Sequence, residues 1–244
     1  MSIYKTFATT RRVLNQLRHD PRTLGIALAV PCLLVVLIKY VFDKDPQVFN
    51  SVAPVIMGIF PLIIMFLITS IAMLRERTSG TLDRLMTAPM SKFDLIFGYA
   101  LAFCMLALLQ ACVVSVVALG LLDVVVAGGT LPLLMTAVLA GFLGTALGLL
   151  VSAAATTEFQ AVQFVMPIIM PQVLLCGLFA PREQMATVLQ WLSNIFPITY
   201  SVEAMKQVST QAFWTADLTR NLCIVAAYGI AALVLGSITI RRQE

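Results

Sequence analysis

Side chains that commonly carry out chemistry are few in this sequence. The single histidine, His19, lies in a basic N-terminal stretch, which rules out His-based metal sites and Ser-His-Asp triads. Asp94, Asp123 and Glu158 stand near the ends of long apolar segments, whereas a proton-coupled carrier would keep an ionisable group at mid-depth. No G-x-x-x-x-G-K-S/T phosphate loop occurs. We therefore predict no catalytic residue, metal site or cofactor site in this chain, and we expect energy to be supplied by another subunit.

Charged residues gather instead in a connection between two apolar segments, residues 75–92. Its sequence predicts a short helix that Pro89 ends, with Leu82, Leu85 and Met86 on its apolar side and Arg84 beside them. A short charged helix of this kind can dock into a soluble partner. An ordinary solvated loop is the alternative.

A second polar pattern lies in residues 181–216, a segment too long for a tight turn and too broken to cross a bilayer. Glu203 and Lys206 have the i,i+3 spacing of neighbours on one helix. Buried together they would form an ion pair, whereas an exposed pair contributes less than about 1 kcal/mol. Trp191, Tyr200 and Trp214 are placed as expected for aromatic residues at a membrane surface.

The elements that must position these residues are membrane helices. Hydrophobic residues make up 60% of the 244 positions and charged residues 11%, whereas soluble domains have about 45–50% and about 25%. About 20 apolar residues in a helix span the ~30 Å hydrocarbon layer. Six segments are long and apolar enough: Leu24–Phe42, Ser51–Leu74, Phe93–Leu122, Leu131–Ala155, Ala161–Ala180 and Asn221–Ile240. The sequence predicts an all-α membrane protein with six transmembrane helices in a single domain, residues 1–244.

The basic residues predict the orientation of these helices. Of 16 Lys and Arg, five precede the first span, four lie in or beside the second connection and two end the chain. By the positive-inside rule both termini are then cytoplasmic, as in a multi-pass protein of a prokaryotic plasma membrane. Residues 1–22 predict an amphipathic helix on the inner leaflet, in contact with anionic lipids. Its apolar face would hold Ile3, Phe7, Val13, Leu14 and Leu17; a disordered basic tail is the alternative.

Proline and glycine mark two of the predicted spans. Pro167 and Pro171 in the fifth predict a deformable helix of the kind that lines a pathway, although proline is also commoner in membrane helices generally. Gly141, Gly144 and Gly148 in the fourth span indicate close packing against a neighbouring helix.

Two motifs resemble those of a known family, the type-2 ABC exporter permeases, which include the daunorubicin-resistance and nodulation-factor export permeases. The first is the pattern Glu76-Arg-x-x-Gly-Thr-Leu-x-x-Leu-x-x-x-Pro89 in the second connection. The second runs from Gly177-Leu-Phe-Ala-Pro181 through Leu189-Gln-Trp-Leu-Ser193 to Phe196-Pro-Ile-Thr-Tyr200-x-x-Glu203-Ala-Met-Lys206. With the six spans, the resemblance covers nearly the whole chain. A single basic residue, Lys92, follows the first motif, where the family usually has more.

The resemblance implies how such a chain works. Two permeases, identical or closely related, would pair with two separate ATP-binding subunits, which bind the ATP and magnesium. Residues 75–92 would form the coupling segment that fits a groove of the ATPase, through Glu76, Arg77, Gly80, Thr81, Leu82, Arg84, Leu85, Met86 and Pro89. ATP-driven closure of the ATPases would then rotate the permeases between inward-open and outward-open states. No nucleic-acid partner is implied.

The resemblance also implies where a substrate would pass. The second and fifth spans would face the dimer axis and line an apolar cavity with adaptable side chains: Phe60, Met65, Phe66, Phe164, Met166, Met170, Gln172 and Phe179. Short re-entrant or surface helices in residues 181–216 would cap it on the outer face, with Tyr200, Glu203 and Lys206 as an outer gate.

These observations together predict the membrane subunit of an ATP-driven exporter for a hydrophobic or amphipathic molecule, such as a drug or toxin. Export of a lipid, lipid-linked glycan or polysaccharide is an alternative of the same class. An intramembrane enzyme is an alternative of another class, and it would need polar residues clustered at one depth; the chain offers four glutamines, Gln110, Gln160, Gln163 and Gln172. A channel or carrier that works alone is a third, and it would not depend on ATP.

Overall fold

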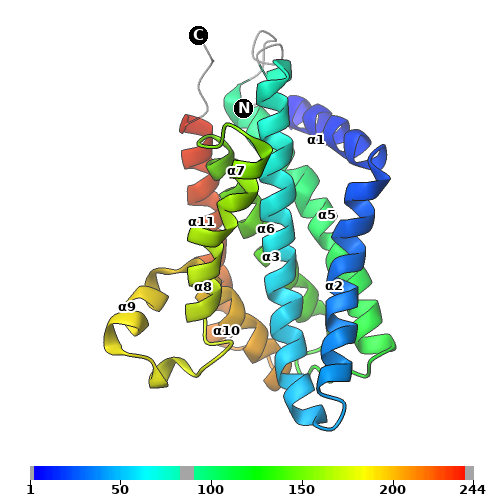
Figure 1. The fold of residues 1–244 in the computed structure, drawn as a ribbon, viewed down its shortest axis with the longest axis vertical. Coiled ribbons are helices and arrows are strands. Elements are labelled where there is room, and N and C mark those ends of the chain that lie inside the picture. The colour runs from blue at the N-terminus through cyan, green and yellow to red at the C-terminus, as the bar shows by residue number, and fades with distance from the viewer. Residues whose placement is uncertain (1–2, 83–90, 240–244) are drawn as a thin grey trace.

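The structure, a computed structural model, describes residues 3–82 and 91–239. Within this part of the chain every regular element is helical, and the long helices run side by side along the long axis of the molecule (Figure 1). Six of them are long and apolar enough to cross a membrane, which confirms the predicted number of spans. They are α2 (Pro21–Val41), α3 (Pro46–Thr78), α5 (Lys92–Gly120), α6 (Thr130–Ser152), the unit 158–175 and α11 (Ala216–Thr239).

Three of these helices begin at a polar side chain that caps the first turn, close to where the apolar segment starts. The pair Asp-Pro occurs twice, and each time the aspartate caps a helix whose first residue is the proline: Asp20 accepts from the Thr23 amide, and Asp45 from the Val48 amide. Ser91 and Asp94 form a capping box at the start of α5. The predicted spans therefore differ from the observed helices mainly at their ends.

The centre of the bundle is the contact between α3 and α6, the most extensive contact between two helices within the described residues. A Cβ atom added at Gly144 would lie 2.1 Å from the Leu62 carbonyl oxygen, and one added at Gly148 would lie 2.6 Å from the Phe66 carbonyl oxygen. Glycine is required at these positions because the two backbones nearly touch. The predicted close packing through these glycines is confirmed, and α3 is the neighbour.

The N-terminal helix α1 (Ile3–Arg18) lies across one end of the bundle and packs on α5 (Figure 1). Its helical state agrees with the sequence analysis, and the contact of its apolar face with the inner leaflet stays a prediction. Ile3 and Phe7 are exposed, whereas Thr6, Thr9 and Thr10 are buried with Val13. The reason is Gly98 of α5: its carbonyl accepts from the Thr10 hydroxyl at 3.1 Å, and a Cβ there would lie 2.6 Å from Thr9. Small threonines therefore fit against α5 better than large apolar residues.

The fifth membrane-crossing unit is not a continuous α-helix. It consists of α7 (Glu158–Gln163), a π-helical turn η1 (Val165–Ile169) and α8 (Met170–Leu175). Pro167 lies in the π-helical turn and Pro171 follows it, and proline removes the amide that a regular helix would use. The interruption occurs where the sequence predicts a deformable helix.

The chain after α8 folds back against the end of the bundle opposite α1 (Figure 1). A short 3-10 turn η2 (Arg182–Gln184) leads into α9 (Thr187–Ile195), and α10 (Pro197–Thr210) then packs against α3, α6 and α11. Residues 181–216 are thus short helices, of which α10 is part of the core and α9 stands away from it.

Candidate functional site

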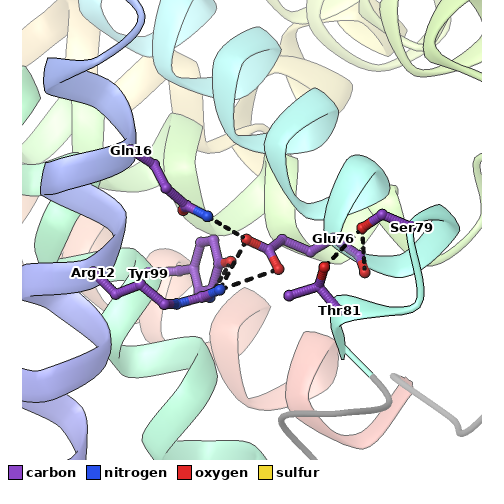
Figure 2. Close-up of polar contacts among 6 residues, drawn as sticks. All are labelled: Arg12, Gln16, Glu76, Ser79, Thr81 and Tyr99. Atoms are coloured by element: carbon purple, nitrogen blue, oxygen red, sulfur yellow. Dashed lines mark hydrogen bonds and ion pairs between the residues drawn. The ribbon is translucent and has the colours of Figure 1, made fainter.

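The end of α3 that leads into the predicted coupling segment is held by a buried carboxylate, that of Glu76. The Arg12 guanidinium of α1 donates to both Glu76 oxygens, at 3.1 and 3.2 Å, and the Gln16 amide donates at 3.1 Å (Figure 2). A second nitrogen of Arg12 donates to the Tyr99 hydroxyl of α5 at 2.7 Å. Glu76 is 7% exposed and Tyr99 1%. The network joins α1, α3 and α5 at one point.

The next residue, Arg77, joins the same end of α3 to α6. Its guanidinium donates to the carbonyl oxygens of Ser152 and Ala153, each at 2.9 Å, and to that of Ala155. These carbonyls belong to the last residues of a helix and the turn after it, where intrahelical partners are missing. Arg77 therefore acts as a side-chain cap for the C-terminal end of α6.

A third link at this end is more exposed. The Arg75 guanidinium donates to both oxygens of Glu158, at 2.7 and 3.0 Å, and so connects α3 to the first residue of α7. Both side chains are more than half exposed, so the pair contributes little to stability, about 0–1 kcal/mol. It nevertheless connects the start of α7 to the last turn of α3.

The chain turns directly after α3. Gly80 has φ +70°, a conformation that favours glycine, and the Ser79 and Thr81 hydroxyls lie 2.9 Å apart across the turn (Figure 2). Leu82 is 1% exposed and packs in the core with Tyr99 and Phe103. The remaining residues assigned to coupling, Arg84, Leu85, Met86 and Pro89, lie outside the described residues.

These contacts correct part of the predicted coupling surface. Glu76, Arg77 and Leu82 are not presented to a partner, because each is bound or buried within the chain itself. From the sequence alone Arg12 was one of several basic residues near the N-terminus, because no local pattern connects it to the carboxylate of Glu76, 64 positions away. For Gly80 and Thr81 the turn that they form is visible, and their contact with a partner stays a prediction.

A second polar cluster lies at the opposite end, between α8 and α10. Arg182 binds the Glu203 carboxylate and the Asn194 side chain, and the Tyr200 hydroxyl donates to the Asn194 carbonyl at 2.6 Å. Lys206 donates to the Gly177 carbonyl, where the chain leaves α8 with φ +84°. The three residues predicted as an outer gate each bind the segment that precedes α10, and their role as a gate stays a prediction.

Of the arrangements that the sequence left open for Glu203 and Lys206, the buried ion pair between them is not formed. Each binds a different part of the preceding segment, because the turn after α8 and the loop before α9 both fold onto the same face of α10. The i,i+3 spacing places Glu203 and Lys206 side by side on one helix, but it does not prevent either residue from binding a group in another segment. The sequence contained no signal that selected Arg182 and Gly177.

The residues predicted to line an apolar pathway do not form one surface in this chain. Met65 and Phe66 are completely buried in the core beside α6, so they line no cavity that a substrate could enter. Gln172 of α8 is buried and donates to the carbonyl of Ile168 in the preceding π-helical turn. Met166 and Phe179 are exposed, and the remaining three are partly buried: Phe60, Phe164 and Met170. The prediction for Met65 and Phe66 is wrong because the glycine face of α6 covers their side of α3.

Sequence reasoning missed a further polar contact inside the membrane region. Pro31 in α2 cannot donate to the Ala27 carbonyl, as the fourth residue of a regular helix would. The Gln110 side chain of α5 donates to that carbonyl at 2.9 Å and is itself fully buried. In the sequence, a proline in one span and a glutamine in another indicated that a free carbonyl could have a partner. Only the packing of α2 on α5 shows that Gln110 is the partner of the carbonyl that Pro31 leaves free.

Comparisons with known proteins place this arrangement in a family. The chain matches a family model described as ABC-2 type transporter over residues 4–209. It is 31% identical over 189 residues to the probable multidrug ABC transporter permease YbhR of Escherichia coli K12, covering 75% of this chain and 51% of that protein. It is 30% identical over 176 residues to ABC transporter G family member 20 of Dictyostelium discoideum, covering 69% of this chain and 24% of that protein.

A third relative is covered more fully. The putative transport permease ycf38 of Cyanophora paradoxa is 24% identical over 227 residues, which are 87% of this chain and 76% of that protein. The chain spans about half of the length of the Escherichia coli relative. Two of these three relatives carry names that describe permeases, and the third is named as an ABC transporter.

Proposed function

Because this chain belongs to the ABC-2 type transporter family, we propose that it is the membrane subunit of an ATP-driven exporter for hydrophobic or amphipathic molecules. A separate ATP-binding subunit docks at the end of α3, and a second copy or a close relative completes the complex. Substrate moves outward by alternating access. Both termini lie in the cytoplasm, and α1 lies on the inner leaflet of a prokaryotic plasma membrane.

The observation that carries the proposal is the way in which the end of α3 is held. At about 1.5 Å per residue, the 33 residues of α3 measure about 50 Å, well beyond a ~30 Å hydrocarbon layer. Its last turn is bound to α1 and α5 through Glu76 and to α6 through Arg77. A displacement applied after Thr78 would move these helices together, as a rigid-body switch requires.

Two further features support the proposal. The multidrug permease of Escherichia coli is similar over three quarters of this chain, which favours a drug-like or amphipathic substrate. Among the described residues, the buried acidic side chains are Glu76 and Asp94, and both lie at helix ends. This placement does not favour the alternatives of an intramembrane enzyme or a proton-coupled carrier, which need such groups at mid-depth.

Co-purification tests the docking of an ATPase. The solubilised full chain is isolated from its native host beside Arg84→Glu, with Arg220→Glu as the matched control, because Arg220 is an exposed arginine at the start of α11. We expect an ATP-binding subunit to accompany the wild type and the control and to be lost from Arg84→Glu. Wild-type chain isolated without any ATPase would refute the proposal.

Direction and substrate need a transport measurement. Inside-out vesicles that contain the complex should accumulate a fluorescent amphipathic dye when ATP is added. Vesicles with an ATPase disabled in its phosphate-binding loop should not. Accumulation that is equal in both kinds of vesicle would show a carrier that works without ATP.

A further inference from the structure

A cavity separate from the predicted substrate pathway lies between α1, the start of α2, the end of α3 and α5. Its volume is about 410 Å³, and it is partly open to the surface. The predicted pathway residues lie on α3, on the fifth membrane unit and on the segment that follows α8, and none of them lines this cavity. The Glu76 network forms part of one wall.

The walls change from apolar to polar along α3. Ile68 and Ala72 line the deeper part together with Phe103 of α5, and Glu76 and Ser79 line the other end. Two helical turns separate Ile68 from Glu76, or about 12 Å. The polar end lies beside Asp20, the residue at which the first span begins. The apolar and polar parts of the cavity therefore match those of an amphipathic molecule, and the polar part lies at the boundary of the membrane region.

The charges at the polar end favour a cationic group. Three charged side chains line the cavity among the described residues: Asp20, Arg75 and Glu76. Arg75 is held by both oxygens of Glu158, which lies outside the cavity, and Glu76 is held by Arg12 and Gln16. The three lining side chains together carry two negative charges and one positive charge, so the polar end is net negative. Asp20 is attracted by Arg75, but Arg75 makes its ion pair with Glu158, so among the described residues Asp20 is the carboxylate of this end that has no ion pair of its own.

Asp20 has the capacity to bind a ligand. Its two oxygens accept from the amide and the hydroxyl of Thr23, at 3.2 and 2.6 Å, which uses two of about four lone-pair positions of a carboxylate. The hydroxyl and amide hydrogen bonds from Thr23 lower the pKa of Asp20 below its ordinary value, so the group is ionised near neutral pH. A donor with several hydrogens, such as an alkylammonium group, can bind the remaining positions.

We propose that this cavity binds the head of an amphipathic amine, with Asp20 as its counter-ion and the apolar chain along Ile68, Ala72 and Phe103. The same head chemistry occurs in single-chain amphiphilic amines and in phosphatidylethanolamine, an amine-bearing lipid of the bilayer. Binding at this position would occur at the cytoplasmic boundary and beside the Glu76 network, so the occupant would touch the helices that meet there.

Photolabelling tests this site without relying on transport. The full chain in phosphatidylcholine nanodiscs is exposed to a long-chain alkylamine with a diazirine in its chain, or to the matching alkyl alcohol, and labelled residues are located by mass spectrometry. We expect the amine, and not the alcohol, to label α3 between Ile68 and Ala72 or α5 near Phe103. Equal labelling by the alcohol, or no labelling of these segments, would overturn the proposal.

Asp20→Asn and Asp45→Asn form a matched pair of variants. Asparagine caps helices about as well as aspartate, so both variants keep the cap and lose one negative charge, but only Asp20 lines the cavity. We expect about tenfold weaker labelling in Asp20→Asn, as for one lost hydrogen bond to a charged group. Asp45→Asn should label as the wild type does, and equal loss in both variants would refute the role of Asp20.

A third variant and a change of lipid complete the test. Ala72→Leu adds volume to the deeper part and should also reduce labelling, which checks that the chain lies there. Phosphatidylethanolamine in the nanodiscs distinguishes the two sources of the amine: competition with the probe identifies the lipid as occupant, and absence of competition identifies free amphiphilic amines. An Ala72→Leu chain that is folded and labels normally would place the probe elsewhere and contradict the proposal.

Discussion

The contact between α3 and α6 predicts a graded response to adding a single methyl group. At Gly144 the new Cβ would lie 2.1 Å from the Leu62 carbonyl oxygen and 2.8 Å from its carbon, whereas ordinary contacts begin near 3.4 Å. The obstacle is backbone, which cannot rotate away, so the helices must separate by about 1 Å over their closest contact. We expect Gly144→Ala to lower the free energy of unfolding by about 3 kcal/mol, the upper end of the usual range for overpacking.

Substitutions at two other glycines serve as comparisons for the stability change expected at Gly144. Gly148→Ala should destabilise less, because its Cβ would lie 2.6 Å from the Phe66 carbonyl oxygen. Gly25 in α2 has nothing within 4 Å of the added atom, so Gly25→Ala should be neutral or stabilising by roughly 0.5–1 kcal/mol from the better helix propensity of alanine.

Equilibrium unfolding in detergent micelles, titrated with SDS and followed by circular dichroism, measures the three changes under one condition. The order of destabilisation should be Gly144→Ala, then Gly148→Ala, then Gly25→Ala. If Gly144→Ala were no less stable than Gly25→Ala, the backbone contact between α3 and α6 would not exist as described, and the fold around it would need revision.

Three further predictions concern polar contacts. Glu76→Leu leaves the partly buried Arg12 without its carboxylate and should lower the free energy of unfolding by about 2–3 kcal/mol in the same titration. Adding Arg12→Met should restore part of the lost stability, and strictly additive effects of the two changes would show that Arg12 and Glu76 do not interact. Gln110→Leu should cost about 1 kcal/mol, and less in a Pro31→Ala background, where the new amide satisfies the Ala27 carbonyl; an undiminished cost there would contradict this reasoning. Lys206→Met should raise amide hydrogen exchange in residues 176–184 while exchange in α6 stays unchanged, and unaltered exchange in residues 176–184 would show that Lys206 does not hold the turn.

The sequence by itself determined the membrane class, the number of spans and the glycine contact surface of α6. Each depends on properties of short stretches, because hydropathy adds up residue by residue along a helix and glycines at helical spacing leave one face open. These inferences succeeded because no distant residue is needed to satisfy them.

Only the tertiary structure decided which polar groups meet. Glu76, Arg77 and Lys206 looked like surface groups of their own segments, yet they bind Arg12, the end of α6 and the turn after α8. In a low-dielectric interior a charge must find a partner wherever the fold brings one within reach, and that partner can be 64 positions away. Because this choice is made by the packing of whole helices, no local pattern of residues can specify it.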